Sequence, residues 1–341
     1  MTKFKRILCL FTVFFLLAAG SAFSQNIINN ITDVVNDFSG ALVNSLPFNS
    51  TIGLNWSDAH IGKFFPSAPP HFGIGLTIGV TSIPIGSINE LAEVFGVNLP
   101  ADVDLGFPMP AYTLDARIGG FFLPFDIGIK FGYLPQIELL TEMTGFGMNY
   151  MLMGADIRYQ LLDLKFLKFS VGLGYNRLEG GVSQGIGDSI TINYGPYSLS
   201  ATQPELGLRW ETDVIEFKAQ LSFPIVVVTP YVGIGASYAW SKAGYGLTST
   251  ITATANGVYV PDIEQIVDEL NNLGLSGITS NGFEQMVEAE GFNFRLFGGL
   301  SVNLPFVRFD LTAMYNLMDT IYTENFNLSS LGITFGVRLQ L

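Results

Sequence analysis

The chain has 341 residues, of which 48% are hydrophobic, 13% are aromatic and only 13% are charged. Soluble proteins carry about 25% charged residues, so this composition argues against an ordinary soluble domain. The formal charge of -13 argues against a nucleic-acid partner, and a single cysteine excludes a disulfide scaffold.

The first 24 residues are typical of a secretory signal peptide. Lys3, Lys5 and Arg6 precede an almost unbroken apolar run over 7–19, and small residues follow at the usual cleavage spacing. We expect cleavage after Ser24, so that 1–24 is removed. Cys9 lies ahead of this point, and the exported chain therefore has no cysteine.

Residues 25–47 have the apolar spacing of an amphipathic helix. Ile31, Val35 and Phe38 are its candidate apolar contacts. Periodicity does not locate a helix, so two interpretations stay open: a plug that enters a lumen, or a periplasmic tail. We divide the exported chain into this segment and a main domain over 48–341.

The main domain shows repeated two-residue alternation, clearest in the final "GITFGVRLQL". Ile333, Phe335, Val337 and Leu339 form one apolar face, and Arg338 lies on the polar face. No apolar run of 18 residues follows the signal peptide, and a closed barrel is the only non-helical structure that spans a bilayer. Aromatic residues fall near strand ends, where interfacial girdles belong. The sequence therefore predicts an all-β, transmembrane, antiparallel up-and-down β-barrel.

Connection lengths orient the barrel, because such barrels have short periplasmic turns and long outer loops. The last strand should run down to the periplasm, and counting back from it predicts twelve strands. The segment "STIGLNW" (50–56) also alternates and would break this even count. Either it lies in the lumen, or it pairs with a further strand in 245–255, which would make fourteen. The twelve predicted strands are 71–83, 111–122, 125–134, 148–161, 165–177, 188–195, 203–212, 214–223, 229–241, 291–303, 306–317 and 332–341.

Three connections are long: 84–110, 178–202 and 242–290. Short helices are predicted over 87–96, 261–274 and 282–291. The second of these would present Ile263, Val267 and Leu270 on one apolar face. Such helices could constrict the mouth or bind an apolar solute. We favour a cap that packs on itself above the rim, since long loops need a local core.

The inward faces of the predicted strands carry charges of both signs. As a functional site they would line a polar path, and as structure they would form cross-strand pairs in a wet interior. The mixed signs argue against a strongly ion-selective pore. The candidate lumen-lining residues are Asp115, Arg117, Asp126, Lys130, Asp156, Arg158, Glu205, Arg209, Glu211, Glu216, Lys218, Arg295, Arg308, Asp310 and Arg338.

The sequence shows no pattern that supports catalysis. His60 and His71 are the only histidines, and neither belongs to a nucleophile–base or HExxH pattern. There is no phosphate-binding loop. We therefore expect no enzyme activity, no cofactor and no metal site.

Together, the signal peptide, the repeated strands and the strand-final "GITFGVRLQL" resemble the outer-membrane β-barrel proteins of double-membraned bacteria. That resemblance implies an outer-membrane location, a lipid-bilayer environment and recognition of the C-terminal strand by the assembly machinery. The family commonly ends on an aromatic residue, whereas this chain ends on Leu341. The lumenal segment and loop helices are also similar in architecture to FadL-like transporters, without that family's Asn-Pro-Ala element in 25–50.

Two functions follow from these expectations. The first is a channel or transporter that passes small solutes, apolar ones included, through a partly plugged lumen. The alternative is a structural or surface-interaction barrel with a closed lumen, acting through its acidic outer loops.

Overall fold

The computed structural model describes residues 39–61, 71–83, 107–120, 124–135, 147–185, 189–194, 197–255, 258–260, 264, 278–279, 282–318 and 330–340. The predicted helices over 87–96 and 261–274 lie outside these residues, apart from a single residue of the second. Among the described residues, no helix is long and apolar enough to cross a membrane.

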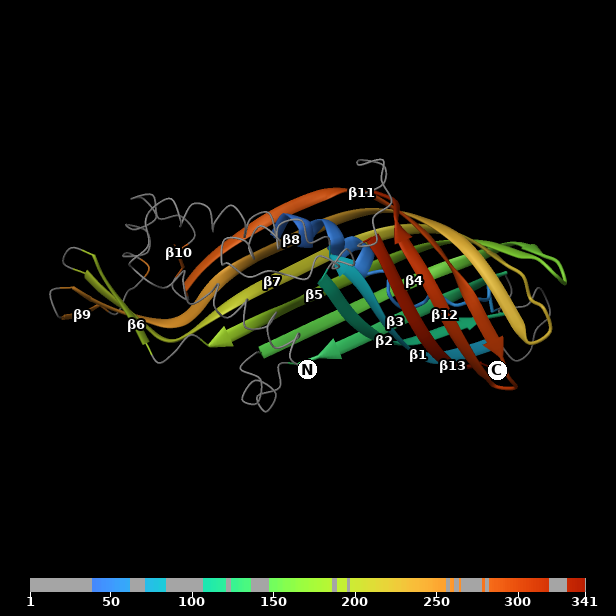
Figure 1. Cartoon of the computed structure of the whole chain (residues 1–341), viewed down its shortest axis with the longest axis horizontal. Helices are drawn as coiled ribbons and strands as arrows, with labels where there is room; N and C mark the ends of the chain where they lie inside the picture. The colour runs from blue at the N-terminus through green and yellow to red at the C-terminus, as the bar shows by residue number, and fades with distance from the viewer. Residues whose placement is uncertain are drawn as a thin grey trace, which may run out of the picture.

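Ten antiparallel strands close into a barrel, because β8 pairs with β11 at the end of an otherwise sequential order (Figure 1). The final strand pairs with the first, so Val337 lies opposite Leu76. The predicted all-β antiparallel barrel is therefore confirmed. Its strands are β1 (His71–Ile83), β2 (Phe107–Gly119), β3 (Phe125–Leu134), β4 (Gly147–Asp163), β5 (Lys168–Gly185), β7 (Tyr197–Ser222), β8 (Val228–Ala255), β11 (Gly282–Asn303), β12 (Val307–Asn316) and β13 (Leu331–Gln340).

The predicted count of twelve, and the alternative of fourteen, are wrong. Segments 203–212 and 214–223 are one strand, β7, with no turn between them. Segment 188–195 corresponds to β6 (Ser189–Tyr194), which pairs only with the far end of β7 and lies outside the ring. The candidate strand in 245–255 is the upper part of β8. Two further short strands, β9 (Val258–Val260) and β10 (Ile278–Thr279), pair antiparallel with the far ends of β8 and β11, respectively.

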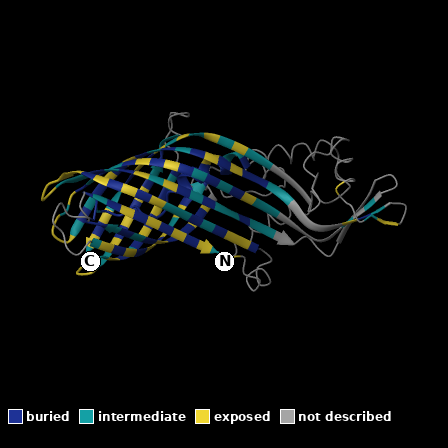
Figure 2. Cartoon of the chain, turned by 180° about the vertical axis from the view of Figure 1, so that it is seen from behind, coloured by how far each residue is buried: buried dark blue, intermediate teal, exposed yellow. Residues whose placement is uncertain are grey.

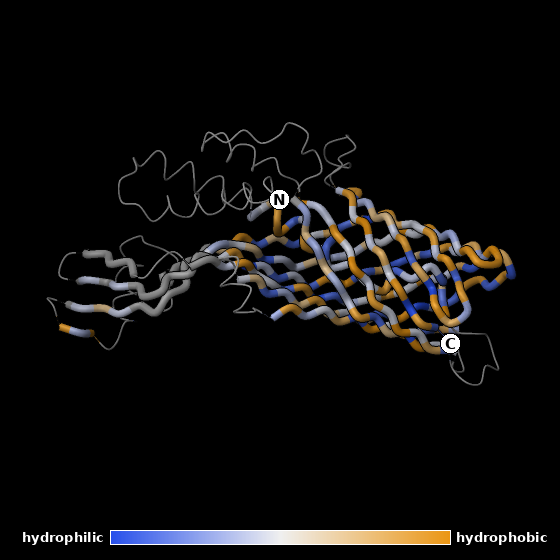
Figure 3. Tube along the Cα trace, turned by 60° about the horizontal axis from the view of Figure 1, so that its bottom comes forward, coloured by the Kyte–Doolittle hydropathy of each residue, from blue (hydrophilic) through white to orange (hydrophobic). Residues whose placement is uncertain are grey.

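Side chains alternate strictly between the two faces of the wall (Figure 2). On β2, Leu114 is 58% exposed, whereas its neighbour Asp115 is 1% exposed. In the part of the ring nearest the C-terminus, the exposed face is mostly apolar and the inner face is mostly polar, as the hydropathy colouring in Figure 3 shows. This distribution is the reverse of that in a soluble protein, and it is expected where lipid surrounds the wall.

The wall has two unequal ends. At the end where the C-terminus lies, short turns such as 164–167 and 304–306 join the strands. We call this the periplasmic end, because short turns face the periplasm in outer-membrane barrels. At the other end, β7 and β8 continue for 26 and 28 residues in all, whereas β12 and β13 have only 10. The predicted helix over 282–291 is wrong, because these residues begin β11. One side of the barrel thus rises well above the other (Figure 1).

The lumen is occupied by the chain's own amino-terminal part. A helix over 39–49 lies inside the ring, and 50–61 continue toward the periplasmic end. The helix contacts the upper ends of β1 and β2, since Asn49 Nδ2 donates to Met109 O at 3.2 Å. At the other end, the backbone N–H of Ile61 donates to Asp126 near the periplasmic turn, at 2.8 Å. We call residues 39–61 the plug; "STIGLNW" lies within it, in the lumen.

Candidate functional site

The outer half of the lumen is an apolar core built around the plug helix. Leu42, Val43 and Leu46 point from the helix into the wall and are fully buried. Leu46 lies four residues after Leu42 and three after Val43, so the three side chains share one apolar face of the helix. The wall residues that pack in this core include Ile83, Met109, Leu152, Leu178, Trp210, Ala243 and Met314.

The periplasmic half of the lumen is a network of ion pairs. Arg117 bridges two carboxylates, Asp126 at 2.6 Å and Asp156 at 2.7 Å. Asp126 also binds Arg158 at 2.7 Å, and Asp156 also binds Lys218 at 2.7 Å. These five side chains come from β2, β3, β4 and β7, and all are buried. Burial of isolated charges costs several kcal/mol, so mutual pairing is what allows them to fill the interior.

Two further pairs complete the ring of charges. Arg295 on β11 binds Glu216 on β7 at 2.6 Å, across the intervening β8. Arg338 on β13 binds Asp310 on β12 at 2.8 Å. Because cations and anions alternate around the wall, the lumen presents no single sign of charge to a solute.

The plug backbone is bound directly by charged wall residues. Lys130 Nζ donates to the carbonyl oxygens of Ser50 and Ile52, at 2.7 and 2.6 Å. Asp115 accepts the backbone N–H of Leu54 at 3.1 Å. Gly53 lies between them with φ +87°, and a Cβ there would come within 2.9 Å of Asp115 Oδ1. Only glycine allows this close approach of the plug to the wall.

Asp58 fixes the periplasmic end of the plug to two arginines. Its carboxylate accepts from Arg308 at 2.6 Å and lies 3.0 Å from Arg338. Burial alone would raise the pKa of Asp58, but the surrounding cations, with Arg338 and Arg308 first, hold it below its usual range. Trp56 adds a stacking contact, with the Arg338 guanidinium 4.7 Å from its ring centre.

His60 is also buried at this end, and neither ring nitrogen has a hydrogen-bond partner among the described residues. Burial lowers the pKa of His60 to about 4, so the ring is neutral at pH 7. The described residues contain no group of three His, Cys, Asp or Glu side chains that could hold a metal ion.

The predicted lumen residues sort into three groups. Arg308 is half-buried against Asp58, whereas Arg209 and Glu211 lie on the opposite face of β7 from buried Trp210, so their predicted inward placement differs from the structure. The predicted apolar contacts Ile31, Val35, Phe38, Ile263, Val267 and Leu270 lie outside the described residues, and so does the side chain of Glu205. The residues buried on the inner face are Asp115, Arg117, Asp126, Lys130, Asp156, Arg158, Glu216, Lys218, Arg295, Asp310 and Arg338.

Sequence reasoning missed the plug's own contacts. Asp58 and Trp56 were not singled out, although both bind arginines of the wall. The available signal was "STIGLNW" itself, a strand-like segment that did not fit the strand count.

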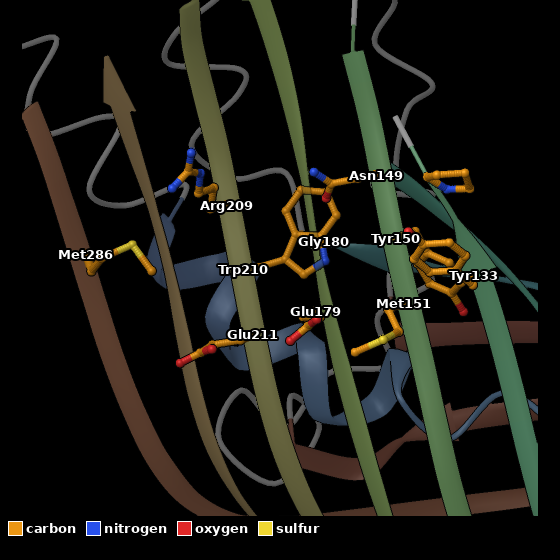
Figure 4. A pocket seen from close by; sticks show the side chains of 11 residues that line it. Tyr133, Asn149, Tyr150, Met151, Glu179, Gly180, Arg209, Trp210, Glu211 and Met286 are labelled. Atoms are coloured by element: carbon orange, nitrogen blue, oxygen red, sulfur yellow. The ribbon is translucent and has the colours of Figure 1, made fainter. Parts of the chain in front are cut away.

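A separate cavity of about 640 Å³ lies at the outer end of the apolar band (Figure 4). Strands β3, β4, β5, β7 and β11 contribute to its lining. Its lining residues come from both faces of the wall: Tyr150 and Trp210 are buried on the inner face, whereas Tyr133, Glu179 and Glu211 are exposed on the outer face. A much smaller enclosed space, lined by Lys130, Asp156 and Lys218 among others, lies within the ion-pair network.

No family model and no curated protein matches the chain. Among solved structures, it is similar to the outer membrane protease OmpT of Escherichia coli (10% identity, 83% of this chain and 100% of that chain, TM-score 0.38). It is also similar to Ail, the attachment invasion locus protein of Yersinia pestis (10%, 80% and 99%, TM-score 0.23). A Pseudomonas aeruginosa FadL homologue matches with 10% identity over 80% of this chain and 89% of that chain, at a TM-score of 0.23. Scores this low carry no argument about activity or ligand.

Proposed function

We propose that this protein is an outer-membrane barrel with a closed lumen, which acts at the cell surface through the side of its wall that rises above the membrane. The plug carries this proposal. It fills the lumen from the outer apolar core down to the periplasmic turns, and wall side chains bind it along its whole described length.

The interior chemistry supports a closed resting state. A water-filled pore needs polar groups that face water, whereas here the wall charges face one another or the plug. To open the lumen, the plug would have to leave and expose Lys130, Asp115 and the two arginines that hold Asp58. Each of these buried charges would lose a partner, which costs free energy, so each of these contacts opposes opening.

The raised side of the wall supports a role outside the membrane. A row of outward-facing charges begins on β5, β7 and β8 at Arg177, Asp213 and Lys242, and marks the upper limit of the apolar band. Above this row, β7 still has residues 197–212, which span about 50 Å along the strand. Strands β6 and β9 widen its far end into a small sheet (Figure 1).

Bilayer recordings test the closed lumen. Purified wild-type protein should show no steady conductance in symmetric KCl, whereas a variant with a weakened plug, Asp58→Asn with Lys130→Met, should show frequent openings. Glu288→Gln, which removes an exposed pair with Lys242 on the outside of the wall, serves as the matched control. Stable channels from the wild-type protein would refute the closed resting state.

Trimming the raised wall tests the surface role. Replacing residues 187–203 by a short linker removes β6 and the far end of β7, which form no part of the barrel ring below. The trimmed protein should change cell adhesion or aggregation while leaving outer-membrane permeability unchanged. The opposite result, altered permeability with unchanged surface behaviour, would count against the proposal.

A second candidate, passage of apolar solutes through the wall, is favoured by one observation. Backbone pairing between β2 and β3 stops at Leu114 and Phe131, although both strands continue upward. On β2, Pro108 and Pro110 have no N–H to donate along this seam. If apolar solutes pass here, Pro108→Val with Pro110→Val should tighten the seam and slow uptake of radiolabelled oleate by cells. Unchanged uptake, or no uptake by the wild type, would remove this candidate.

A further inference from the structure

Two neighbouring turns at the periplasmic end present apolar side chains to the outside. The first joins β7 to β8 and the second joins β11 to β12. The side chain of Val226, in the first turn, is 98% exposed, and that of Phe306, in the second, is 68% exposed. The backbone N–H of Asn303 donates to Val227 O at 2.7 Å, so the two turns lie side by side. We call their exposed side chains the rim patch: Ile225, Val226, Val227, Leu304 and Phe306.

The backbone at both apices favours glycine, yet each apex holds a large apolar residue. Val226 has φ +50° and Phe306 has φ +70°. Positions of positive φ in hairpin turns are usually occupied by Gly, Asn or Asp, and a β-branched residue there is an outlier. Residues held in strained backbone conformations cluster at functional and contact sites. The two apical side chains are therefore candidates for a contact outside the chain.

The rim patch continues the lipid-facing surface without interruption. The sequence has no charged residue over 219–241 or over 296–307. Outward side chains such as Val232 on β8 and Leu300 on β11 are exposed and apolar, and the two strands are paired down to the turns. The rim patch is thus the lower end of an apolar surface that already faces lipid.

This side of the wall has more apolar height than a bilayer requires. A tilted strand crosses the hydrocarbon layer in about 9–11 residues. On β5, Lys168 and Arg177 lie nine residues apart and bound a stretch of that length. On the neighbouring β7, Val226 lies 13 residues after Asp213, and Lys168 is paired with Ser222, so the turn continues past the level of Lys168. The surplus is about 2–4 residues.

We infer that the rim patch is immersed in the periplasmic leaflet, where it binds the acyl chains of phospholipids. An apolar surface longer than the local hydrocarbon thickness is accommodated by tilt or by local thickening of the bilayer. The patch carries no cation for a lipid phosphate, so the contact is with the chains. Copies in one membrane point this end in the same direction, so a second copy does not cover it. The inference does not depend on the closed lumen or on the surface role, because the patch lies outside the wall.

Single spin labels test the immersion on protein in nanodiscs of dioleoylphosphatidylcholine. The exported chain is expected to have no cysteine, so Val226→Cys and Phe306→Cys each give one labelling site. Ile234→Cys, on the lipid-facing wall, and Glu288→Cys, at the exposed pair with Lys242, supply the lipid and water references. Oxygen collects in hydrocarbon and a nickel chelate stays in water. The ratio of collisions with oxygen to collisions with nickel at 226 and 306 should match the ratio at 234.

Ratios that match the Glu288→Cys reference would overturn the inference, because the turns would then project into the periplasm. Labels that are shielded from both reagents in native outer membranes, but not in nanodiscs, would also overturn it, since a protein would then cover the patch.

A polar variant assigns the effect to the apices. Val226→Asn with Phe306→Asn keeps residues that accept positive φ, so the heat-modifiable gel shift in detergent should not weaken. In lipid, a label at Ile225→Cys should move toward the water reference. Phe166→Asn is the matched control, since Phe166 is also 68% exposed but lies in the turn that joins β4 to β5. An unmoved Ile225 label would show that the apices do not hold the patch in lipid. Should the variant fail to fold, the single labels still decide the inference.

Discussion

Asp58 offers the sharpest test of how the plug is held. Replacing it by Asn keeps the size of the side chain but removes the charge that meets Arg308 at 2.6 Å and Arg338 at 3.0 Å. Breaking a fully buried pair costs about 3–5 kcal/mol. The side chains of Asp58 and Arg308 are 18% and 26% exposed, and Arg338 keeps Asp310, so the cost here should be lower. We expect plug docking to weaken by about 2–3 kcal/mol.

Thiol protection measures this change. The exported chain is expected to have no cysteine, so Ser50→Cys places a single reporter at a fully buried position of the plug. Its labelling rate, divided by the rate of a free thiol, reports the fraction of time that the plug is released. Asp58→Asn should accelerate labelling about 30- to 150-fold, since each 1.4 kcal/mol is a factor of ten.

Two controls make the result specific. Glu288→Gln removes an exposed carboxylate on the outside of the wall and should leave labelling unchanged. Arg308→Gln combined with Asp58→Asn should cost less than the sum of the two single changes, because the partners act on each other. A rate change below about threefold for Asp58→Asn would refute the view that this pair anchors the plug.

Three further outcomes follow from the same contacts. Gly128→Ala should lower the thermal transition of the barrel by several degrees in a heat-modifiable gel assay, since its Cβ would lie 2.6 Å from a carboxylate oxygen of the network; Gly291→Ala, with open space around it, should not. Asn44→Cys, exposed on the outer side of the plug helix, should react with an impermeant maleimide on intact cells, and labelling only after permeabilisation would contradict the orientation. The pKa of His60 falls from 6.5 to about 4 on burial, so its contribution to docking is complete above pH 6.5 and is lost as the pH falls toward 4. The plug that carries the Ser50→Cys reporter should therefore open about 20-fold more often at pH 5 than at pH 7, and His60→Gln should remove that difference.

The barrel itself could be predicted because lipid imposes one rule on every strand within it. Alternation such as that of Ile127, Ile129 and Phe131 against Asp126 and Lys130 needs no knowledge of neighbouring strands. The partners of these charges could not be predicted. Arg117 contacts Asp156 across β3, and Arg295 contacts Glu216 across β8, so both pairs depend on the tilt and register of a wall that local sequence does not report.

The predicted strand count is wrong because the surroundings of a single strand change from lipid to water along its length. Within the membrane, β7 places Ile215 and Phe217 outward and Glu216 inward; above it, Trp210 points inward to the plug core, whereas Arg209 and Glu211 lie on the outer face in water. The polarity of the two faces therefore inverts without any turn, and the inversion resembles a change of strand. The same inversion on β11, where Glu288 and Glu290 share the outer face, imitates helical spacing in 282–291.

This inversion carries structural information of its own. A strand whose apolar face switches sides midway is a strand that leaves the membrane and continues in water around an apolar core. On β7 the switch falls at Asp213, which also binds Arg177 in the outward row of charges. Only long strands can show such a switch, and here they are neighbours, so the raised wall is one continuous surface rather than a set of separate loops. The surface role that we propose would thus rest on the same hydrogen-bonded sheet that forms the barrel, and this continuity gives the outer surface the rigidity of the barrel.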